Sequence, residues 1–257
     1  MSVDLNRIRR YERKYLVNPE QAAVVREFVR GFMEPDLHTE PDLGGYTVNN
    51  LYLDTPDLYF YHEVKLRRLR RFKPRMRYYG ADTSGGLWLE VKNKYGEIVW
   101  KNRHRVSDKL WPEVLQPRPA TDASAVLLAG PTTFEDMVGL FPVEPVMHVR
   151  YFREAWVSAI DPYGRVTFDT RLRCRPAHGS TRLVSPENEL AFFDDPVTTD
   201  AGDSMILVEV KTETQVPWWA LEIARRAELW QRGFSKYCYG VDRFLARPDS
   251  QGRAARR

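Results

Sequence analysis

The chain has 257 residues, of which 43% are hydrophobic and 29% charged, and 39 Lys and Arg against 35 Asp and Glu give a formal net charge of +4. This composition is typical of a soluble globular protein with one large or two small domains. No run of about eighteen apolar residues predicts a membrane span, and the N-terminus lacks the apolar core of a secretory signal. Two cysteines, Cys174 and Cys238, are too few for a disulfide framework or a thiolate zinc site. We therefore expect a cytoplasmic protein.

The first third of the chain predicts a strand, a helix, a loop and a second strand. Residues 6–17 alternate as a strand does, and Asn18-Pro19 has the pattern of an N-cap followed by a first-turn proline. Apolar residues at helical spacing then predict a helix over 19–33. The predicted loop covers 34–45, the next strand Tyr46–Asp54, and a turn or helix starts at Asp54.

Strands dominate the rest of the prediction. The candidates in order are Arg75–Tyr79, Leu87–Lys94, Ile98–Val106, Val146–Ser158, Arg165–Arg173 and Met205–Glu213. Helices are predicted over 122–129, 132–140 and 217–231. Residues 246–257 lack an apolar pattern and predict a disordered basic tail. The simplest interpretation is one domain over 1–245, mainly antiparallel sheet with a few helices.

Positive charge is concentrated in one segment. Residues 63–77, EVKLRRLRRFKPRMR, carry eight basic side chains and one acidic side chain. Such a block repels itself unless an anion or carboxylates lie nearby. The sequence pI of about 9.0 allows nucleic acid, nucleotide or polyphosphate as a partner without choosing among them.

Several predicted strands pair a charged face with an apolar face. An E-x-K pattern recurs in Glu12/Lys14, Glu90/Lys92 and Glu209/Lys211, and strand residues two apart share a face. One explanation is an antiparallel sheet with one face in water. The other is a closed barrel with a basic lumen, which would need an anionic occupant because unpaired buried charge is costly. Several phosphates and a divalent metal held by carboxylates would meet that need.

Eight segments together resemble a known family, although none is decisive alone. They are RYERKYLV, LYLDTPDLYFY, KPRMRYYG, LWLEVKNKYGEIVWKNR, RYFREAWVS, VTFDTRLR, ILVEVKTE and GFSKYCYGV. In this order they resemble the VTC (vacuolar transporter chaperone) domain, the polyphosphate polymerase branch of the triphosphate tunnel metalloenzymes, over residues 7–245. The chain is similar to compact stand-alone bacterial members, without the SPX and transmembrane domains of the fungal complex.

The resemblance implies an α+β fold in which an antiparallel closed β-barrel with flanking helices forms a tunnel. It implies transfer of the γ-phosphoryl group of ATP to a growing polyphosphate chain, with Mn²⁺ or Mg²⁺ as cofactor. Lys236 and Ser235 are expected beside the reacting phosphates, with Arg75 and Arg77 clamping the triphosphate. The remaining phosphate-binding residues implied are Lys14, Lys92, Lys101, Arg103, Tyr151 and Arg153.

Glu209 is the implied metal ligand, with Glu12 and Glu90 as weaker candidates. The wider superfamily carries a fuller E-x-E-x-K pattern on its first strand, and here Arg10 stands two residues before Glu12. This departure argues against a two-metal hydrolytic site and favours a transferase. Asp169 stays open as an ion-pair partner or a metal ligand through water.

Three other functions remain as alternatives. A hydrolase of the same fold would cleave tripolyphosphate or a nucleoside triphosphate, and a non-catalytic module would bind polyphosphate without needing Glu209. Specific nucleic-acid binding is least favoured, because no recognition helix, zinc finger or aromatic RNA-binding motif is present. ATP and polyphosphate are thus the expected partners, and a membrane partner protein encoded elsewhere stays open.

Overall fold

The computed structural model describes residues 11–96, 98–117, 131, 133–161, 163–196, 205–213 and 216–245. The predicted strand residues 6–10, the predicted helix over 122–129 and the basic tail over 246–257 lie outside these residues. Within them, no helix combines the length and the apolar character that a membrane crossing requires.

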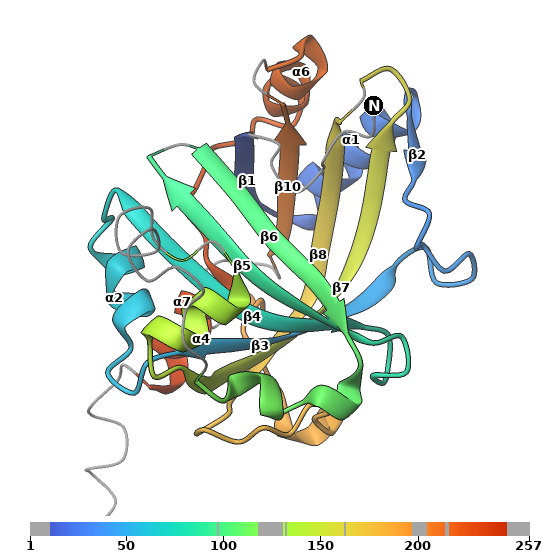
Figure 1. The fold of residues 1–257 in the computed structure, drawn as a ribbon. Coiled ribbons are helices and arrows are strands. Elements are labelled where there is room, and N and C mark those ends of the chain that lie inside the picture. Colours follow the sequence, from blue (N-terminus) through green and yellow to red (C-terminus); the bar gives the residue numbers. More distant parts are fainter. Residues whose placement is uncertain are drawn as a thin grey trace, which may run out of the picture.

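One curled antiparallel sheet organises the described chain (Figure 1). Its main path runs β1-β10-β8-β7-β3-β4-β5-β6. The strands on this path are β1 (Tyr11–Val17), β3 (Tyr46–Asp54), β4 (Arg70–Tyr79), β5 (Leu87–Tyr95), β6 (Ile98–Val106), β7 (Glu144–Ser158), β8 (Arg165–Pro176) and β10 (Ile206–Thr212). Two short strands lie off it: β2 (Met33–Pro35) pairs with β7 and β9 (Ala191–Phe192) with β8. The predicted α+β class and the predicted strands are confirmed.

The two edge strands, β1 and β6, meet along a seam. Among the described strands no ladder pairs β1 with β6, so the sheet is curled into a barrel that is not fully closed. The connection across the seam is ionic: Lys92 Nζ on β5 lies 2.5 Å from Glu12 Oε2 on β1. Long charged side chains fill the space between the edges, so side chains and not backbone hydrogen bonds join them.

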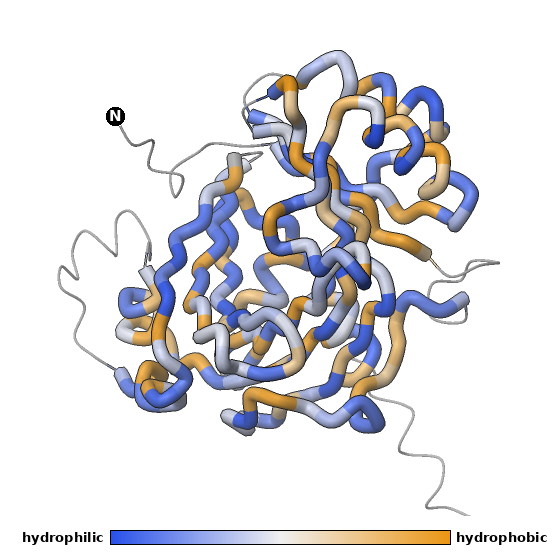
Figure 2. Tube along the Cα trace, turned by 90° about the vertical axis from the view of Figure 1, so that its right-hand side faces the viewer, coloured by the Kyte–Doolittle hydropathy of each residue, from blue (hydrophilic) through white to orange (hydrophobic). Residues whose placement is uncertain are grey.

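Apolar residues of the strands face outward and are covered by helices. The helices are α1 (Pro19–Arg30), α2 (Tyr59–Lys65), α4 (Phe134–Leu140), α6 (Trp218–Arg226) and α7 (Lys236–Phe244), with short 3-10 turns over Asp108–Leu110, Glu113–Leu115 and Glu187–Glu189. Helices α1 and α6 pack on β1, β8 and β10 through residues such as Val25, Trp219 and Phe168. Hydrophilic and hydrophobic residues alternate along the strands in Figure 2. The charged residues of the strands therefore lie on the inner face of the sheet.

Two helices end earlier than predicted, and one helix was not predicted. Helix α1 begins as expected at a capping box, in which Asn18 Oδ1 accepts from the Gln21 N–H at 2.8 Å, but it ends at Arg30. Helix α6 ends at Arg226, five residues early, and it is followed by the unpredicted helix α7. Ser235 caps α7 by accepting from the Cys238 N–H at 3.3 Å.

A buried carboxylate fixes where α7 begins. Asp54, at the end of β3, is fully buried and accepts hydrogen bonds from the backbone N–H groups of Phe60 and Tyr61. It also accepts from the Tyr237 hydroxyl at 2.6 Å. Because Tyr237 is the second residue of α7, this contact anchors the two residues before it, Ser235 and Lys236, at the inner face of the sheet.

Candidate functional site

The inward-facing charged residues line a cavity of about 680 Å³. Its lining includes every predicted site residue except Glu90: Glu12, Lys14, Arg75, Arg77, Lys92, Lys101, Arg103, Tyr151, Arg153, Glu209, Ser235 and Lys236. Glu90 lies directly beneath the wall with no surface in solvent. The structure thus brings the predicted residues together in one place, and it adds Lys73, Arg105, Arg165 and Lys211.

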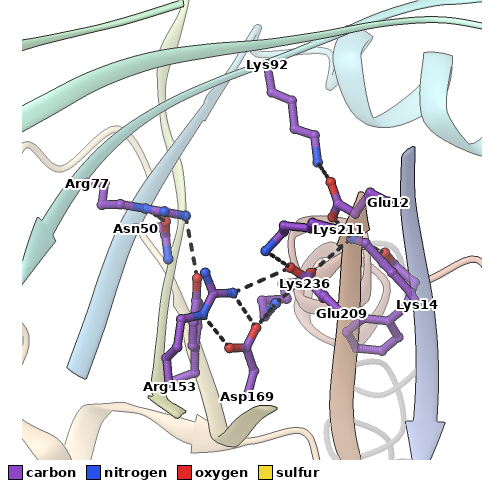
Figure 3. Close-up of polar contacts among 12 residues, drawn as sticks. Glu12, Lys14, Asn50, Arg77, Lys92, Arg153, Asp169, Glu209, Lys211 and Lys236 are labelled. Atoms are coloured by element: carbon purple, nitrogen blue, oxygen red, sulfur yellow. Dashed lines mark hydrogen bonds and ion pairs between the residues drawn. The ribbon is translucent and has the colours of Figure 1, made fainter. Parts of the chain in front are cut away.

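Glu209 is the most heavily contacted carboxylate of the cavity (Figure 3). Its oxygens lie 2.9 Å from Lys211 Nζ, 3.3 Å from Lys14 Nζ and 3.4 Å from Lys236 Nζ. Arg153 Nη2 lies 3.5 Å away. Burial alone would raise the pKa of Glu209, but these cations hold it well below its usual range. Glu209 is therefore an anion at neutral pH.

Asp169 is an ion-pair partner inside the same cluster. Arg153 binds it with two donors, Nε to Oδ1 at 2.6 Å and Nη2 to Oδ2 at 2.7 Å, and Lys236 Nζ lies 2.5 Å from the same Oδ2. Lys236, which the N-terminus of α7 carries into the cavity, thus bridges Asp169 and Glu209. Its ammonium also lies 4.6 Å from the centre of the Tyr151 ring. Lys236 is consequently fixed from three directions.

Glu90 organises the opposite wall. Arg75 binds it through Nε at 2.7 Å and Nη2 at 2.6 Å, and Lys101 Nζ lies 2.9 Å from its other oxygen. Arg77 lies 3.8 Å away and donates from Nε to Asn50 Oδ1 at 2.8 Å. Burial would raise the pKa of Glu90, but these three cations hold it well below its usual range. One buried carboxylate thus orients both predicted clamp arginines.

Lys73 is a cavity cation with no carboxylate partner among the described residues. Its Nζ donates to Ser235 Oγ at 2.8 Å. Burial lowers the pKa of Lys73, and the neighbouring Lys14 and Arg75 lower it further. An anion placed beside Ser235 would relieve this repulsion, which makes Lys73 a strong candidate for phosphate binding.

The cavity is electrostatically two-sided. Strands β4, β5 and β6 present Lys73, Arg75, Arg77, Lys92, Lys101, Arg103 and Arg105, and within these three strands Glu90 is the sole carboxylate. The opposite side, formed by β1, β8 and β10, contains Glu12, Asp169 and Glu209 interleaved with lysines. The first side, here called the cationic wall, therefore offers the uncompensated positive charge.

The second side, here called the carboxylate wall, has the donor chemistry for a divalent metal. Lys14 Nζ lies 3.3 Å from both Glu12 and Glu209, so these two carboxylates lie next to the same ammonium group and close to each other. The described residues contain no group of three or more His, Cys, Asp or Glu side chains placed to hold one ion. Hard oxygen ligands suit Mn²⁺ and Mg²⁺, and Mg²⁺ is commonly held by one or two carboxylates together with substrate phosphates. Glu209 and Glu12 line the cavity and fit that mode, whereas Glu90 has no surface in solvent and does not line the cavity.

The predicted residues outside these clusters also have defined contacts. Tyr151 is buried, and its hydroxyl accepts from Arg77 Nη2 at 3.5 Å. Arg103 is exposed and stacks over the Trp88 ring at 4.5 Å. Tyr151 thus supports the cationic side chains, and the Trp88 ring supports Arg103.

Strand periodicity could have identified the residues that the sequence reasoning missed. Lys73 stands two positions before Arg75, Arg105 two after Arg103, and Lys211 two after Glu209, so each shares a face with a predicted residue. Arg165, at the start of β8, stands four positions before Asp169 and shares its face in the same way.

The described fold and its two-sided basic cavity define a protein of the triphosphate tunnel class. A family model described as VTC domain matches residues 9–245, and the chain belongs to that family. The resemblance drawn from the eight segments is confirmed.

Solved structures and curated sequences add little beyond the fold. A candidate adenylate cyclase from Bacillus halodurans is similar with 14% identity and a TM-score of 0.47, covering 91% of this chain and 96% of that chain. A candidate adenylate cyclase from Vibrio parahaemolyticus has 12% identity and a TM-score of 0.47, covering 90% and 97%. No curated protein sequence matches. At this level of similarity, neither structure bears on the activity of this chain.

Proposed function

We propose that the chain is a metal-dependent polyphosphate polymerase that transfers the γ-phosphoryl group of ATP to the end of a polyphosphate chain. The observation that carries this proposal is the division of the cavity into a cationic wall and a carboxylate wall. A polyanion would neutralise the first wall, and Glu209 with Glu12 on the second wall would offer oxygen ligands to a divalent ion that also binds the phosphates. The size of the cavity, about 680 Å³, suits several phosphate groups.

The residues supply positioning and charge neutralisation. Arg75 and Arg77 bind non-bridging oxygens with paired donors, held in direction by Glu90 and Asn50. An oxygen of the terminal chain phosphate attacks the γ-phosphorus, the bond from that phosphorus to the β–γ bridging oxygen breaks, and ADP leaves. Lys236, fixed by Asp169, binds the transferred group, and Lys73 and Ser235 hold the adjacent phosphate. The bound metal would neutralise charge that develops on the phosphoryl oxygens.

The low pKa values of the carboxylates favour transfer to phosphate over hydrolysis. Glu12, Asp169 and Glu209 each contact cations, and their pKa values are lowered despite burial. A carboxylate with a low pKa is a weak general base for water. A phosphate chain end is already an anionic nucleophile and needs no such base.

The test is an incubation with ATP and Mn²⁺, with and without a short polyphosphate primer, followed by ³¹P NMR. Growth of the internal-phosphate signal with an equal release of ADP would support the polymerase. Release of orthophosphate without chain growth would show that the protein is a hydrolase. Tight polyphosphate binding without turnover would show that it binds polyphosphate without catalysis. Arg26→Gln should turn over ATP like the parent protein, because Arg26 pairs with Glu154 outside the cavity at 2.7 Å.

Affinity for tripolyphosphate is expected to fall as the pH rises from 6 to 9. Burial lowers the pKa of Lys101 to about 7 and that of Lys92 to about 8. A bound anion favours the charged form of both amines. While both lysines are protonated, the affinity does not depend on their titration. Above their pKa values the amines must take up protons when the anion binds, so the affinity falls. We expect about tenfold weaker binding for each lysine that loses its proton.

Titration calorimetry at several pH values measures this effect. Lys101→Met should remove the step near pH 7 and leave the step near pH 8. If the variant and the parent protein show the same dependence on pH, then Lys101 does not contact the anion.

A further inference from the structure

The loop between α2 and β4 is both basic and apolar. Residues 65–71, which run from the last residue of α2 through this loop into β4, read KLRRLRR and include five cations and no acidic residue. Residues 65–69 are all exposed, and Leu66 and Leu69 keep 63% and 59% of their surface in solvent. The tunnel uses only the later part of the basic block, from Lys73 onward, and leaves this earlier part without a role.

The backbone holds these leucines at the surface. At the end of α2 the N–H groups of Leu66 and Arg67 donate to the carbonyls of His62 and Val64, and Arg67 has a φ of 53°. This left-handed residue turns the chain away from the helix. The segment is therefore an ordered turn that presents its apolar side chains outward.

The tip of the β5–β6 hairpin extends the same surface. The Gly96 N–H donates to the Leu69 carbonyl at 2.9 Å, and Tyr95, which is opposite Arg70 in the ladder, is 51% exposed. We define the basic apolar patch as Lys65, Leu66, Arg67, Arg68, Leu69 and Tyr95. Helix α2, whose last residue is Lys65, lies on the left in Figure 1.

Acidic neighbours compensate the patch only in part. Lys65 pairs with Asp242 at 3.0 Å and Arg68 with Glu63 at 3.6 Å, and both pairs are solvent-exposed. Arg67 forms an ion pair with none of the described carboxylates. Exposed pairs of this kind exchange readily with other anions, so the surface keeps a net positive field.

We propose that the basic apolar patch docks on the surface of an anionic lipid bilayer. Anionic headgroups attract the arginines and lysines, and the two leucines with Tyr95 enter the interface between headgroups and acyl chains. A soluble polyanion or an acidic protein surface would satisfy the cations alone, so the exposed leucines favour a bilayer. The proposal is independent of the activity of the tunnel.

Docking would also orient the tunnel. Arg71 and Lys94 face each other in the ladder two residues beyond the cavity pair Lys73 and Lys92, at the end of the sheet where the patch lies. A protein bound through the patch therefore turns this end of its cavity toward the bilayer and leaves the opposite end, with Arg77 and Arg105, toward solvent.

Co-sedimentation with vesicles tests the proposal. We expect the protein to bind vesicles of phosphatidylcholine with phosphatidylglycerol and not vesicles of phosphatidylcholine alone. Leu66→Ser with Leu69→Ser should weaken binding at least about tenfold, since two apolar side chains no longer enter the interface. Arg67→Asn with Arg68→Gln should weaken it by about the same factor through lost charge, and asparagine tolerates the left-handed backbone.

The matched control is Leu221→Ser with Arg225→Gln on α6. Leu221 is 58% exposed and the Arg225 side chain 73%, so the same residue types are changed at similar exposure, and binding should not change. Equal binding by the leucine variant and the parent protein, with loss only in the arginine variant, would overturn the proposal in favour of a soluble polyanion. Absence of binding to the anionic vesicles would also overturn it. Thermal unfolding of each variant verifies that the fold is intact.

Discussion

Glu209→Gln is expected to reduce the rate of polyphosphate synthesis about a hundredfold and to raise the Mn²⁺ concentration needed for half-maximal rate about ten- to a hundredfold. The substitution keeps the size of the side chain and removes the charge that Lys14, Lys211 and Lys236 surround. A neutral amide is a poor ligand for a hard cation. The measurement is the initial rate of ADP release against Mn²⁺ concentration at saturating ATP.

Glu154→Gln provides the control for this result. Glu154 is also a partly buried carboxylate in an ion pair, with Arg26 at 2.7 Å, but it lies outside the cavity. Its Mn²⁺ dependence should equal that of the parent protein. An unchanged Mn²⁺ dependence in Glu209→Gln would show that Glu209 does not bind the metal. The same titration of Glu12→Gln would then test the neighbouring carboxylate.

Glu90→Gln is expected to lower the free energy of unfolding by about 3–5 kcal/mol at pH 7, because a buried charge loses its partner. Arg75, Arg77 and Lys101 would face one another without a carboxylate between them. The pKa of Glu90 is lowered in the folded state, so its contribution is present at neutral pH and is lost as the pH falls below about 4. Urea unfolding measures the difference.

Tripolyphosphate should restore much of the stability lost in Glu90→Gln, since its oxygens can take the place of the missing carboxylate. Glu222→Gln is the control: Glu222 pairs with Arg225 and Arg226 at 2.7 Å on α6, and because such surface pairs contribute little, this variant should unfold like the parent protein. If Glu90→Gln unfolds like the parent protein, then water already screens the cationic wall.

The strands could be predicted because each has two chemically different faces. In β10, Val208 and Val210 face the helices while Glu209 and Lys211 face the cavity, and the alternation in the sequence shows both faces at once. The same alternation left two explanations open, a solvated face or a charged interior. The curl of the sheet decides between them, and it is a property of the whole set of strands and not of any one segment.

Helix α7 and the choice of ion-pair partners could not be predicted. Helix α7 starts where Asp54 holds Tyr237, a contact between residues far apart in the chain. The pattern E-x-K places Glu90 and Lys92 on one face without giving their partners, and in the structure Glu90 binds Lys101 while Lys92 reaches across the seam to Glu12. Partner choice depends on the register and curvature of neighbouring strands, which sequence spacing alone does not specify.

The seam between β1 and β6 is the place where the circumference of the barrel could change. Among the described strands its edges are connected by side chains, with Lys92 and Glu12 in contact at 2.5 Å, and not by a backbone ladder. An anion that takes Lys92 as its partner releases Glu12, and the two edges can then move apart without breaking a hydrogen bond within any pair of strands. Such a movement would widen the cavity while every strand kept its place in the sheet.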